Sequence, residues 1–593
     1  MNEQQDSVYR FGDFALDVGK RLLTRGAGEV VPLTPKAFEI LVLLVQNSGR
    51  VVDKDELKKR VWADTHVGET TLAQNIFTLR KALGDDQNKP HYIKTVLRRG
   101  YRFVAEVKTP ERTPPAEPEK PPAAAGARAE QPGSRQTASA DLAVLPFSHA
   151  ESDKDLEYLS GALTEGVINK LSPSLRVVAR SVVSRHKGHD VNAQEVGRAL
   201  GVQYVLAGRL VRFAGRLSIS GELIDVDKGW QVWGEQYGRE ENAPLASMEE
   251  VARQISEAVL TRLAAGPQAG SPRYSENAEA NQCYLKGRYF WARQTEDGCL
   301  KAIEYFKKAI KRDSNYALAY CGLADVYISL DIQSLLPPWE IMPKAKVSVL
   351  RAKELDDSLA EAHATLGCVK MLYDHEWEVA EDEFRRAIRL NPAYPHSHNW
   401  YSLYLLAVGR FEESYAEIRR ALECDPLDLS INQNLGFYYL YTRQYDRAIG
   451  HLRKTLEIAP DHCLLRFLLG RAYESRGDAE AAVSEFKKAE GMTHSMFLPG
   501  LLGHAYAQLG DEGEARRLLE ELKKVSEHRY VPPYGMGLIH LGLGEKNEAL
   551  AYFQKACDIG NEWMIFSKVN PALDGLRSDP SFAEMLKCMN LNE

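Results

Sequence analysis

Residues 70–83 are predicted to form a helix whose two faces differ in chemistry. Apolar residues recur at helical spacing, at Leu72, Ile76, Leu79 and Leu83. The opposite face carries Thr70, Gln74, Thr78 and Lys81, and no acidic residue. Hydroxyl and amide groups can hydrogen bond to base edges, and a lysine can approach a phosphate. The spacing therefore predicts a helix that packs on one side and reads the major groove of DNA on the other.

A basic hairpin is predicted to follow this helix. Residues 91–96 and 101–104 form two predicted strands, which Leu97, Arg98, Arg99 and Gly100 connect. A cationic hairpin tip of this kind can enter the minor groove beside a helix in the major groove. The alternative for both arginines is a solvated surface that makes no contact with DNA.

Earlier segments must hold the helix and the hairpin in place. Short strands are predicted at residues 9–17, 22–24 and 30–33. Thr34 is placed to cap a helix that has Pro35 at its first position. Asp53 and Glu56 have the spacing of a capping box at the start of a second helix, which is expected to end near Trp62.

These motifs, in this order, resemble the OmpR/PhoB-type winged-helix family over nearly all of residues 8–106. The matching motifs are Leu33-Thr34-Pro35-Lys36-Ala37-Phe38-Glu39-Ile40-Leu41, residues 57–62, Leu72-x-x-x-Ile76-x-x-Leu79-Arg80-Lys81-Ala82-Leu83-Gly84 and Gly100-Tyr101-Arg102-Phe103. The resemblance implies an α+β winged helix-turn-helix that binds double-stranded DNA in a bacterial transcription regulator.

The resemblance also implies roles for single residues. Base readout is expected near Gln74 and Thr78, and the loop 63–68 is expected to be available to RNA polymerase. Phosphate contacts are expected near Thr70, Thr71, Asn75, Arg80, Thr95 and Tyr101. With the cations of the helix and the wing, the full expected DNA-binding set is Thr70, Thr71, Gln74, Asn75, Thr78, Arg80, Lys81, Thr95, Arg98, Arg99 and Tyr101.

Several positions allow a second interpretation. Phe77 and Thr78 stand where family members often have arginine, and Leu97 occupies a common basic position of the wing. Arg98 and Arg99 can replace that wing cation, but the target sequence cannot be deduced. Arg80 is also compatible with an intramolecular salt bridge, and Tyr101, Phe103 and Trp62 are equally compatible with the core.

The family's response regulators usually carry a phosphoacceptor domain before the winged helix, and its membrane-anchored members a transmembrane helix after it. Here the winged helix is expected to begin at residue 8 and to be followed by a Pro/Ala-rich linker at 107–140. A flexible tether of that length spans roughly 28 to 34 Å, which would uncouple the orientations of the domains. We expect a cytoplasmic, one-component regulator without a receiver domain or a membrane contact.

Charge and cysteine content fit this expectation. The net charge is -7, yet residues 1–106 contain 17 Lys and Arg against 14 Asp and Glu, a net charge of +3. The basic excess thus lies in the predicted DNA-binding segment. All eight cysteines follow residue 280 without a C-x-x-C pair, which favours reduced thiols over disulfides or a zinc site.

An internal period of 34 residues marks the C-terminal half. It relates Pro392, Pro426 and Pro460, and also the pairs Gly436 and Gly470, Tyr439 and Tyr473, and Ala448 and Ala482. The pattern resembles tetratricopeptide repeats. It implies about eight units in an all-α superhelix over 276–560, with a capping segment at 561–593, and a concave groove that binds a protein or peptide partner. Residues 335–343, with Pro337 and Pro338, are expected to be an insertion.

Residues 141–265 alternate between strand-like and helix-like patterns and form a predicted small α/β domain. Its motifs, Leu142-Ala143-Val144-Leu145-Pro146-Phe147, Gly201-Val202-x-Tyr204-Val205-Leu206-x-Gly208 and Trp233-x-x-x-Tyr237, resemble a module similar to the N-terminal domain of TolB. The resemblance implies no particular ligand. The whole chain is therefore expected to be multidomain.

No enzyme is expected, because the common nucleotide-binding, hydrolase and metalloprotease motifs are missing from the sequence. No cofactor or metal is expected either. His186 with His189, and His396 with His398, lack further ligands at metal-binding spacing and are interpreted as surface histidines. The alternatives to a DNA-binding regulator are a repeat scaffold whose winged helix does not bind DNA, and an undetected enzyme in residues 141–265.

Overall fold

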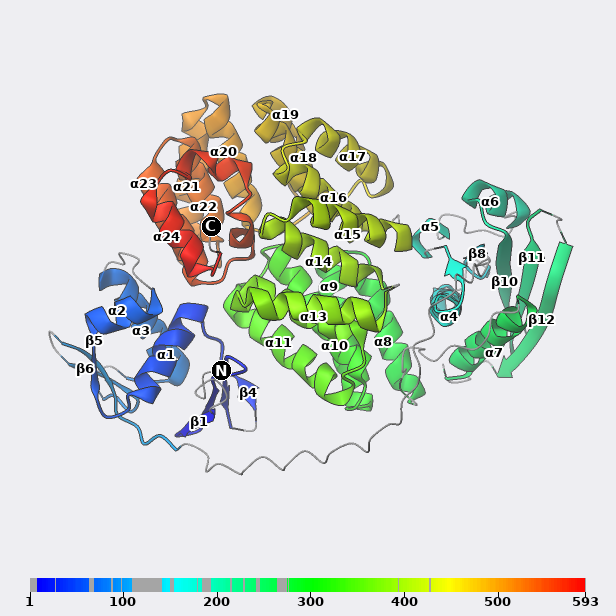
Figure 1. Cartoon of the computed structure of the whole chain (residues 1–593), viewed down its shortest axis with the longest axis horizontal. Helices are drawn as coiled ribbons and strands as arrows, with labels where there is room; N and C mark the ends of the chain where they lie inside the picture. The colour runs from blue at the N-terminus through cyan, green and yellow to red at the C-terminus, as the bar shows by residue number, and fades with distance from the viewer. Residues whose placement is uncertain are drawn as a thin grey trace, which may run out of the picture.

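The computed structural model describes most of the 593 residues. The described ranges are 8–26, 28–62, 69–86, 89–96, 99–108, 141–149, 154–178, 180–183, 193–213, 216–227, 230–240, 246–263, 275, 277–392, 394–425 and 428–591. The expected polymerase loop at 63–68, the linker from residue 109 to 140, Arg98, His186 and His189 lie outside these ranges. Figure 1 shows a winged helix and an α/β module on different sides of a helical array.

The winged helix contains two small sheets and a helical core. The first sheet has the order β1 (Val8–Phe11), β2 (Phe14–Asp17), β3 (Leu22–Arg25) and β4 (Glu29–Val30). The elements that follow are α1 (Pro35–Gln46), β5 (Val51–Asp53), α2 (Lys54–Val61), α3 (Glu69–Leu83), β6 (Ile93–Val96) and β7 (Gly100–Phe103). Strand β7 lies between β5 and β6 in an antiparallel sheet.

Local sequence signals correctly predict where the helices begin, but one of the predicted helix caps does not form. The Thr34 hydroxyl accepts a hydrogen bond from the Ala37 amide at 3.2 Å, and Pro35 is the first helical residue, as predicted. Asp53 precedes α2 as predicted, but its side chain makes no capping bond. Glu56 pairs instead with Arg50 at 2.9 Å, so the predicted capping box was wrong although the helix start was right.

The middle module is a five-stranded sheet with helices on both faces. Its elements are β8 (Asp141–Val144), α4 (Lys154–Leu171), β9 (Arg176–Val177), α5 (Arg180–Val183), α6 (Ala193–Leu200), β10 (Tyr204–Phe213), β11 (Arg216–Asp225), β12 (Trp230–Glu240) and α7 (Ala246–Arg262). The strand order is β12-β11-β10-β8-β9. Alternate residues of β8 enter different cores: Leu142 and Val144 pack with α4 and α7, and Ala143 packs with α6.

The array consists of eight helix pairs in the described residues, as the period predicts. The pairs are α8 (Ala278–Trp291) with α9 (Glu296–Arg312), α10 (Ala317–Ile332) with α11 (Pro338–Leu355), α12 (Ala360–Val369) with α13 (Trp377–Leu390), α14 (Pro395–Ala407) with α15 (Phe411–Cys424), α16 (Leu429–Tyr441) with α17 (Tyr445–Ile458), α18 (Cys463–Arg476) with α19 (Ala479–Ala489), α20 (Phe497–Leu509) with α21 (Glu512–Val525), and α22 (Pro533–Gly542) with α23 (Lys546–Asp558). None of the helices in the described ranges is long and apolar enough to cross a membrane.

The expected insertion around Pro337 is present but is mostly helical. Helix α12 begins at Ala360, 43 residues after the start of α10 at Ala317 and nine more than the 34-residue period. Pro338 is the first residue of α11, and Pro343 lies inside this helix, which continues to Leu355. Proline at a helix start lacks only an amide that would have no partner there. The Pro-Pro pair therefore begins the second helix of a repeat that is longer than the 34-residue period.

Small residues at the repeat positions allow the paired helices to approach closely. A Cβ added at Gly470 would lie 2.4 Å from the Phe486 ring, whereas one added at Gly450 would meet no atom within 4 Å. Gly470→Ala is expected to destabilise the array by about 1 to 3 kcal/mol through overpacking. Gly450→Ala is expected to stabilise it by up to about 1 kcal/mol, because alanine favours the helix. Urea unfolding of both variants checks the difference in sign.

His398 is buried, which contradicts the prediction that it lies at the surface. It is 3% exposed, and its ring bonds to Glu417 at 2.5 Å and to the Pro392 carbonyl at 3.0 Å. The equivalent position of two other repeats is occupied by His363 and Arg466. His363 bonds to Glu383 and to the Asp357 carbonyl, and Arg466 bonds to Glu485 and to the Pro460 carbonyl. His398 thus joins the two helices of one repeat. No group of three or more metal-ligating side chains occurs in the described part of the chain.

The segment after the last pair does more than cap the array. It comprises η2 (Glu562–Phe566), η3 (Pro571–Leu576) and α24 (Pro580–Cys588). Its residues contact several distant pairs: Trp563 bonds at 3.2 Å to Ser334, in the turn after α10, and Asn570 accepts a bond at 2.8 Å from Arg471 of α18. Phe566 also stacks on Phe437. The segment therefore occupies part of the inner face that was expected to be an open groove.

Both N-terminal domains contact the array directly. The Trp62 indole donates to Asp558 at 3.0 Å, and the Tyr373 hydroxyl donates to the Leu33 carbonyl at 2.7 Å. On the α/β module, the Tyr158 hydroxyl donates to the Gln282 carbonyl at 2.8 Å. The expected orientational uncoupling is thus contradicted, because the winged helix packs against the repeats. We call the contact between the winged helix and the array the seam.

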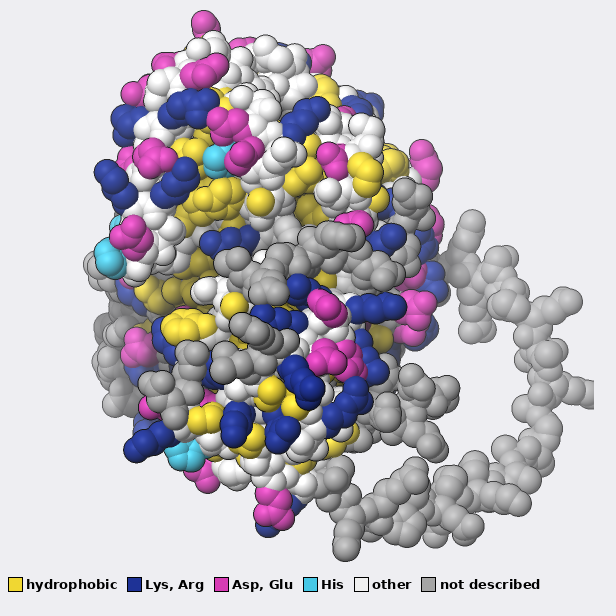
Figure 2. All heavy atoms as spheres, turned by 90° about the vertical axis from the view of Figure 1, so that its left-hand side faces the viewer, with side chains coloured by type: hydrophobic (Ala, Val, Ile, Leu, Met, Phe, Trp, Pro, Cys, Tyr) yellow, Lys and Arg dark blue, Asp and Glu magenta, His cyan; other side chains and the backbone are white. Residues whose placement is uncertain are grey.

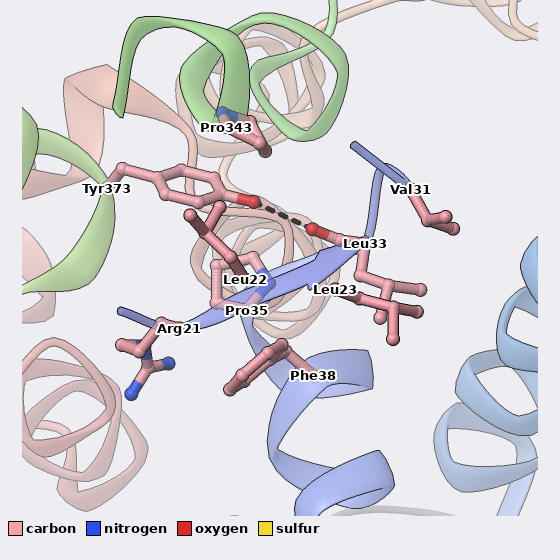
Figure 3. Close-up of a pocket in the computed structure, with 9 residues that line it drawn as sticks. All are labelled: Arg21, Leu22, Leu23, Val31, Leu33, Pro35, Phe38, Pro343 and Tyr373. Atoms are coloured by element: carbon pink, nitrogen blue, oxygen red, sulfur yellow. Dashed lines mark hydrogen bonds between the residues drawn. The ribbon is translucent and has the colours of Figure 1, made fainter. Parts of the chain in front are cut away.

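The apolar part of the seam is formed by β3, the start of α1 and the array. Figure 3 shows Tyr373 reaching from the array toward β3, with its hydroxyl directed at Leu33. Pro343 of α11 and Phe38 of α1 line the same small pocket. Pro35 approaches within 3.2 Å of the position that a Cβ on Gly560 would take. A glycine at 560, with φ +72°, therefore permits the close approach.

Candidate nucleic-acid interface

Helix α3 presents the two faces that its sequence predicts. Leu72, Ile76, Leu79 and Leu83 are 0–3% exposed and belong to the core of the winged helix. Gln74 and Lys81 are exposed on the other side. Both side chains are exposed while the winged helix is docked on the array, so docking at the seam leaves this face of α3 open.

The smaller polar residues of α3 are partly satisfied within the helix. The Thr78 hydroxyl donates to the Gln74 carbonyl at 3.0 Å, and the Asn75 amide donates to the Thr71 carbonyl at 3.0 Å. Their oxygen atoms remain acceptors, and a ligand can replace such local bonds. Thr70 lies in α3, but its side chain is outside the described residues.

The wing places exposed polar groups next to this helix. Arg99 is exposed, and its amide donates to the Val96 carbonyl at 3.0 Å, which closes the turn between β6 and β7. Thr95 is exposed on β6. Gly100 is required at the end of the turn, because a Cβ there would lie 2.0 Å from the Val52 carbonyl oxygen. The β5 strand thus fixes the base of the wing and with it the position of Arg99.

Arg80 and Tyr101, two of the expected phosphate contacts, are largely buried. Arg80 is 8% exposed, and its guanidinium donates to the Ile93 carbonyl at 2.9 Å and to the Thr95 hydroxyl at 2.8 Å. Tyr101 is 7% exposed. In this conformation, Arg80 ties α3 to the first strand of the wing.

Two further residues of this surface were not in the expected set. Phe77 is 62% exposed, one turn after Gln74 and on the same side of α3. Lys94 is exposed on β6. The helical spacing that buries Ile76 already implies that Phe77 points outward, but the sequence comparison with the family marked it only as a missing arginine.

The surface around these residues is basic. Figure 2 shows Lys and Arg side chains gathered on the lower half of the face, at the level of the winged helix in Figure 1. Among the described residues of α3 and the wing, the exposed cations are Lys81, Lys94 and Arg99. Cations beside exposed amide and apolar groups are the combination that DNA recognition uses.

Family models match all three parts of the chain. Residues 28–103 match the model described as "Transcriptional regulatory protein, C terminal", and residues 138–255 match "HilA/YgeH-like transcriptional regulator, second domain". Residues 372–428, 434–493 and 534–559 match tetratricopeptide repeat models. The chain therefore has an N-terminal OmpR/PhoB-type DNA-binding domain, a HilA-like regulator domain and C-terminal tetratricopeptide repeats.

Curated relatives extend these matches over much of the chain. The transcriptional regulator HilA of Salmonella typhi is 24% identical over 406 residues, which cover 68% of this chain and 68% of the relative. The transcriptional activator CadC of Escherichia coli is 36% identical over 104 residues, covering 17% of this chain and 20% of the relative. A candidate adenylate cyclase of Rhizobium meliloti is 29% identical over 204 residues, covering 34% and 35%.

Proposed function

We propose that this DNA-binding transcriptional regulator reads a specific duplex sequence with α3 in the major groove and the wing in the minor groove. The observation that carries the proposal is the open face of α3, where exposed Gln74 and Lys81 lie on the side opposite the buried stripe. Gln74 can bond to an adenine edge, and Arg99 can enter a narrow minor groove. In this proposal the winged helix stays docked on the array while it binds DNA.

Other residues of the set have supporting roles. Phe77 would contact a thymine methyl group, because an exposed phenyl ring beside Gln74 is suited to apolar contact in the major groove. Thr70, Thr71, Asn75, Thr78, Thr95, Lys81, Lys94 and Arg98 would contact the DNA backbone or neighbouring bases. Arg80 and Tyr101 would position the wing from the interior, as the bond from Arg80 to Thr95 indicates.

A mobility-shift experiment on the full chain tests the function against the scaffold alternative. Full-length protein and residues 1–108 are each titrated with random duplex DNA at low salt. Binding of DNA by both proteins supports the proposal. If neither binds DNA while the repeats of the full chain bind a protein or peptide, the scaffold alternative is supported.

Salt dependence gives a quantitative form of this experiment. Roughly four to six phosphate contacts per protomer lead us to expect a slope of about -4 to -5 for log affinity against log salt concentration. Binding is measured by fluorescence anisotropy between low and physiological salt. The variants Lys81→Ala and Lys94→Ala should each reduce the slope by about 1. An affinity that is independent of salt would contradict groove binding.

The remaining parts complete the proposed regulator. We infer functional boundaries at 8–106 for the winged helix, 107–140 for the linker, 141–265 for the α/β domain, 276–560 for the repeats and 561–593 for the C-terminal segment. The repeats would bind a protein or peptide on the inner face that the C-terminal segment leaves uncovered. The loop 63–68 would contact RNA polymerase. We propose a cytoplasmic protein that regulates without catalysis.

A further inference from the structure

The polar part of the seam encloses a cavity of about 180 Å³. The winged helix and the array both contribute to its wall. The winged helix supplies Arg21, Pro35, Lys36, Glu39, Arg60, Val61 and Trp62, and the array with its C-terminal segment supplies Asp374, His375, Cys557, Lys587, Cys588 and Asn590. A water fills about 10 to 15 Å³ of such space, so the cavity has room for a ligand of several non-hydrogen atoms.

The wall of the cavity carries an excess of positive charge. Four cations, Arg21, Lys36, Arg60 and Lys587, face two carboxylates, Glu39 and Asp374. Glu39 already accepts bonds from Arg21 and Lys36, both at 3.1 Å.

Asp374 is also compensated, from outside the cavity wall. Its Oδ2 atom accepts bonds from Lys346 at 2.5 Å and Lys370 at 3.1 Å. Burial alone would raise the pKa of the Asp374 carboxyl, but Lys346, Lys370 and Arg21 hold the pKa below its usual value. Both carboxylates therefore already have cationic partners. Of the outer cations that line the cavity, Arg60 makes, among the described residues, only a 3.7 Å pair with Glu56, so it and Lys587 can meet another anion.

One side of the cavity includes a π-helical turn. The π-helix η1 (Lys370–Asp374) ends at His375, which adopts a left-handed φ of 53°. Across the seam, Arg21 is also left-handed, with φ 49°. π-helical turns are rare and are often found at functional sites. His375 occupies the turn position at which each helix pair has a positive-φ residue, as at Arg443 and Gly477, and it meets Arg21 at the wall of the cavity.

The buried side chain of His375 has a ring nitrogen without a hydrogen-bond partner in the described part of the chain. It is 6% exposed, and its Nε2 atom has no hydrogen-bond partner among the described residues. Burial, together with Arg21 and Lys36, lowers the pKa of this imidazole to about 4, so the ring is neutral at pH 7. A neutral imidazole can donate one hydrogen bond to a bound oxygen atom. Buried groups of this kind normally have a partner.

We propose that the seam cavity binds a small anion that carries a phosphate or carboxylate group and is smaller than a nucleotide. Arg60 from the winged helix and Lys587 from α24 would hold the anion, and His375 would donate to it. Because the two cations come from different domains, the bound anion would strengthen docking. The cavity shares no residue with the proposed DNA-reading face, so a failure of this proposal leaves the proposed function untouched.

Binding is tested on the full chain with inorganic phosphate and with succinate, against chloride at equal ionic strength. Isothermal titration should detect saturable binding of at least one of the two anions. The double variant Arg60→Gln, Lys587→Gln should raise the dissociation constant at least tenfold. Arg50→Gln is the matched control, because Arg50 and Arg60 both pair with Glu56 but Arg50 is outside the cavity. It should change the constant less than twofold.

Chemical labelling locates the site independently. Cys588 lines the cavity and is partly exposed, whereas Cys424 is partly exposed elsewhere in the array. A saturating concentration of the anion that binds should slow alkylation of Cys588 by iodoacetamide at least threefold and leave Cys424 unchanged. Saturable binding with selective protection supports the proposal. No saturable binding, equal affinity in the double variant or equal protection of both thiols would overturn it.

Discussion

Replacing Asp374 by Ala is expected to lower the free energy of unfolding by about 3 to 5 kcal/mol, which is the usual cost of leaving a buried charge without its partner. Asp374 and Lys346 are each 1% exposed in their side chains, and their charged atoms are 2.5 Å apart. Arg21 adds a weaker contact across the seam at 3.9 Å. The variant would leave Lys346 buried beside Lys370 without an anion. Urea denaturation, followed by circular dichroism, measures the loss.

A surface carboxylate is the control for this prediction. Asp446 pairs with Arg476 at 3.2 Å, and its side chain is 87% exposed. Asp446→Ala should change the free energy of unfolding by less than about 1 kcal/mol, because water screens an exposed pair. Equal losses for the two variants would show that burial of the Asp374 pair does not determine its contribution.

Replacing Trp62 by Ala is expected to cost about 3 to 5 kcal/mol in the full chain, through lost packing and the loss of one of the two donors that the described residues offer to the buried Asp558 carboxylate. Trp62 is 2% exposed and bonds to Asp558 of α23. Trp62→Phe keeps an aromatic ring but removes the donor, so it isolates the hydrogen bond. Trp62→Phe should destabilise the full chain by about 1 to 3 kcal/mol more than it destabilises residues 1–108. Equal losses in the two proteins would place the effect inside the winged helix.

The same contact gives docking a dependence on pH. Burial raises the pKa of the Asp558 carboxyl from 3.8 to about 6, although Trp62 and Gln554 donate to it. The docked carboxyl therefore holds its proton more tightly than a solvated one between pH 3.8 and 6. Stability from this group is present below that window and is lost as the pH rises through about 6. Hydrogen exchange at the seam, corrected for intrinsic rates, should show more protection at pH 5.5 than at pH 7.5, and Asp558→Asn should remove the difference.

The sequence predicted the parts of the molecule that short-range rules govern. The stripe from Leu72 to Leu83, the cap at Thr34 and the 34-residue period each depend on neighbours within one helix or one repeat. Gly436 and Gly470 contact Leu452 and Phe486 as the repeat pattern requires. These elements form in the expected places because local propensity and core packing favour the same arrangement.

Long-range contacts were not predictable from such patterns. Trp62 and Asp558 are 496 residues apart, and nothing in either local sequence indicates that they meet. The burial of Arg80 beneath the wing likewise depends on the register of β6 against β7, which places Ile93 and Thr95 within reach of α3. The composition of the linker predicted that the domains would orient freely. Contacts at the seam, and not the linker, determine the orientation of the winged helix relative to the array.

Selection of binding sites from a random duplex library tests the central claim most directly. Full-length protein and Gln74→Ala are taken through the same rounds, and the enriched sequences are compared with those of Arg99→Ala. If α3 reads bases, the wild type should enrich one sequence motif, and Gln74→Ala should lose preference at one position by about 1 to 3 kcal/mol. Arg99→Ala should keep the motif and weaken all sequences more evenly. No enrichment by the wild type, or the same motif for Gln74→Ala with unchanged preference, would contradict readout by this face.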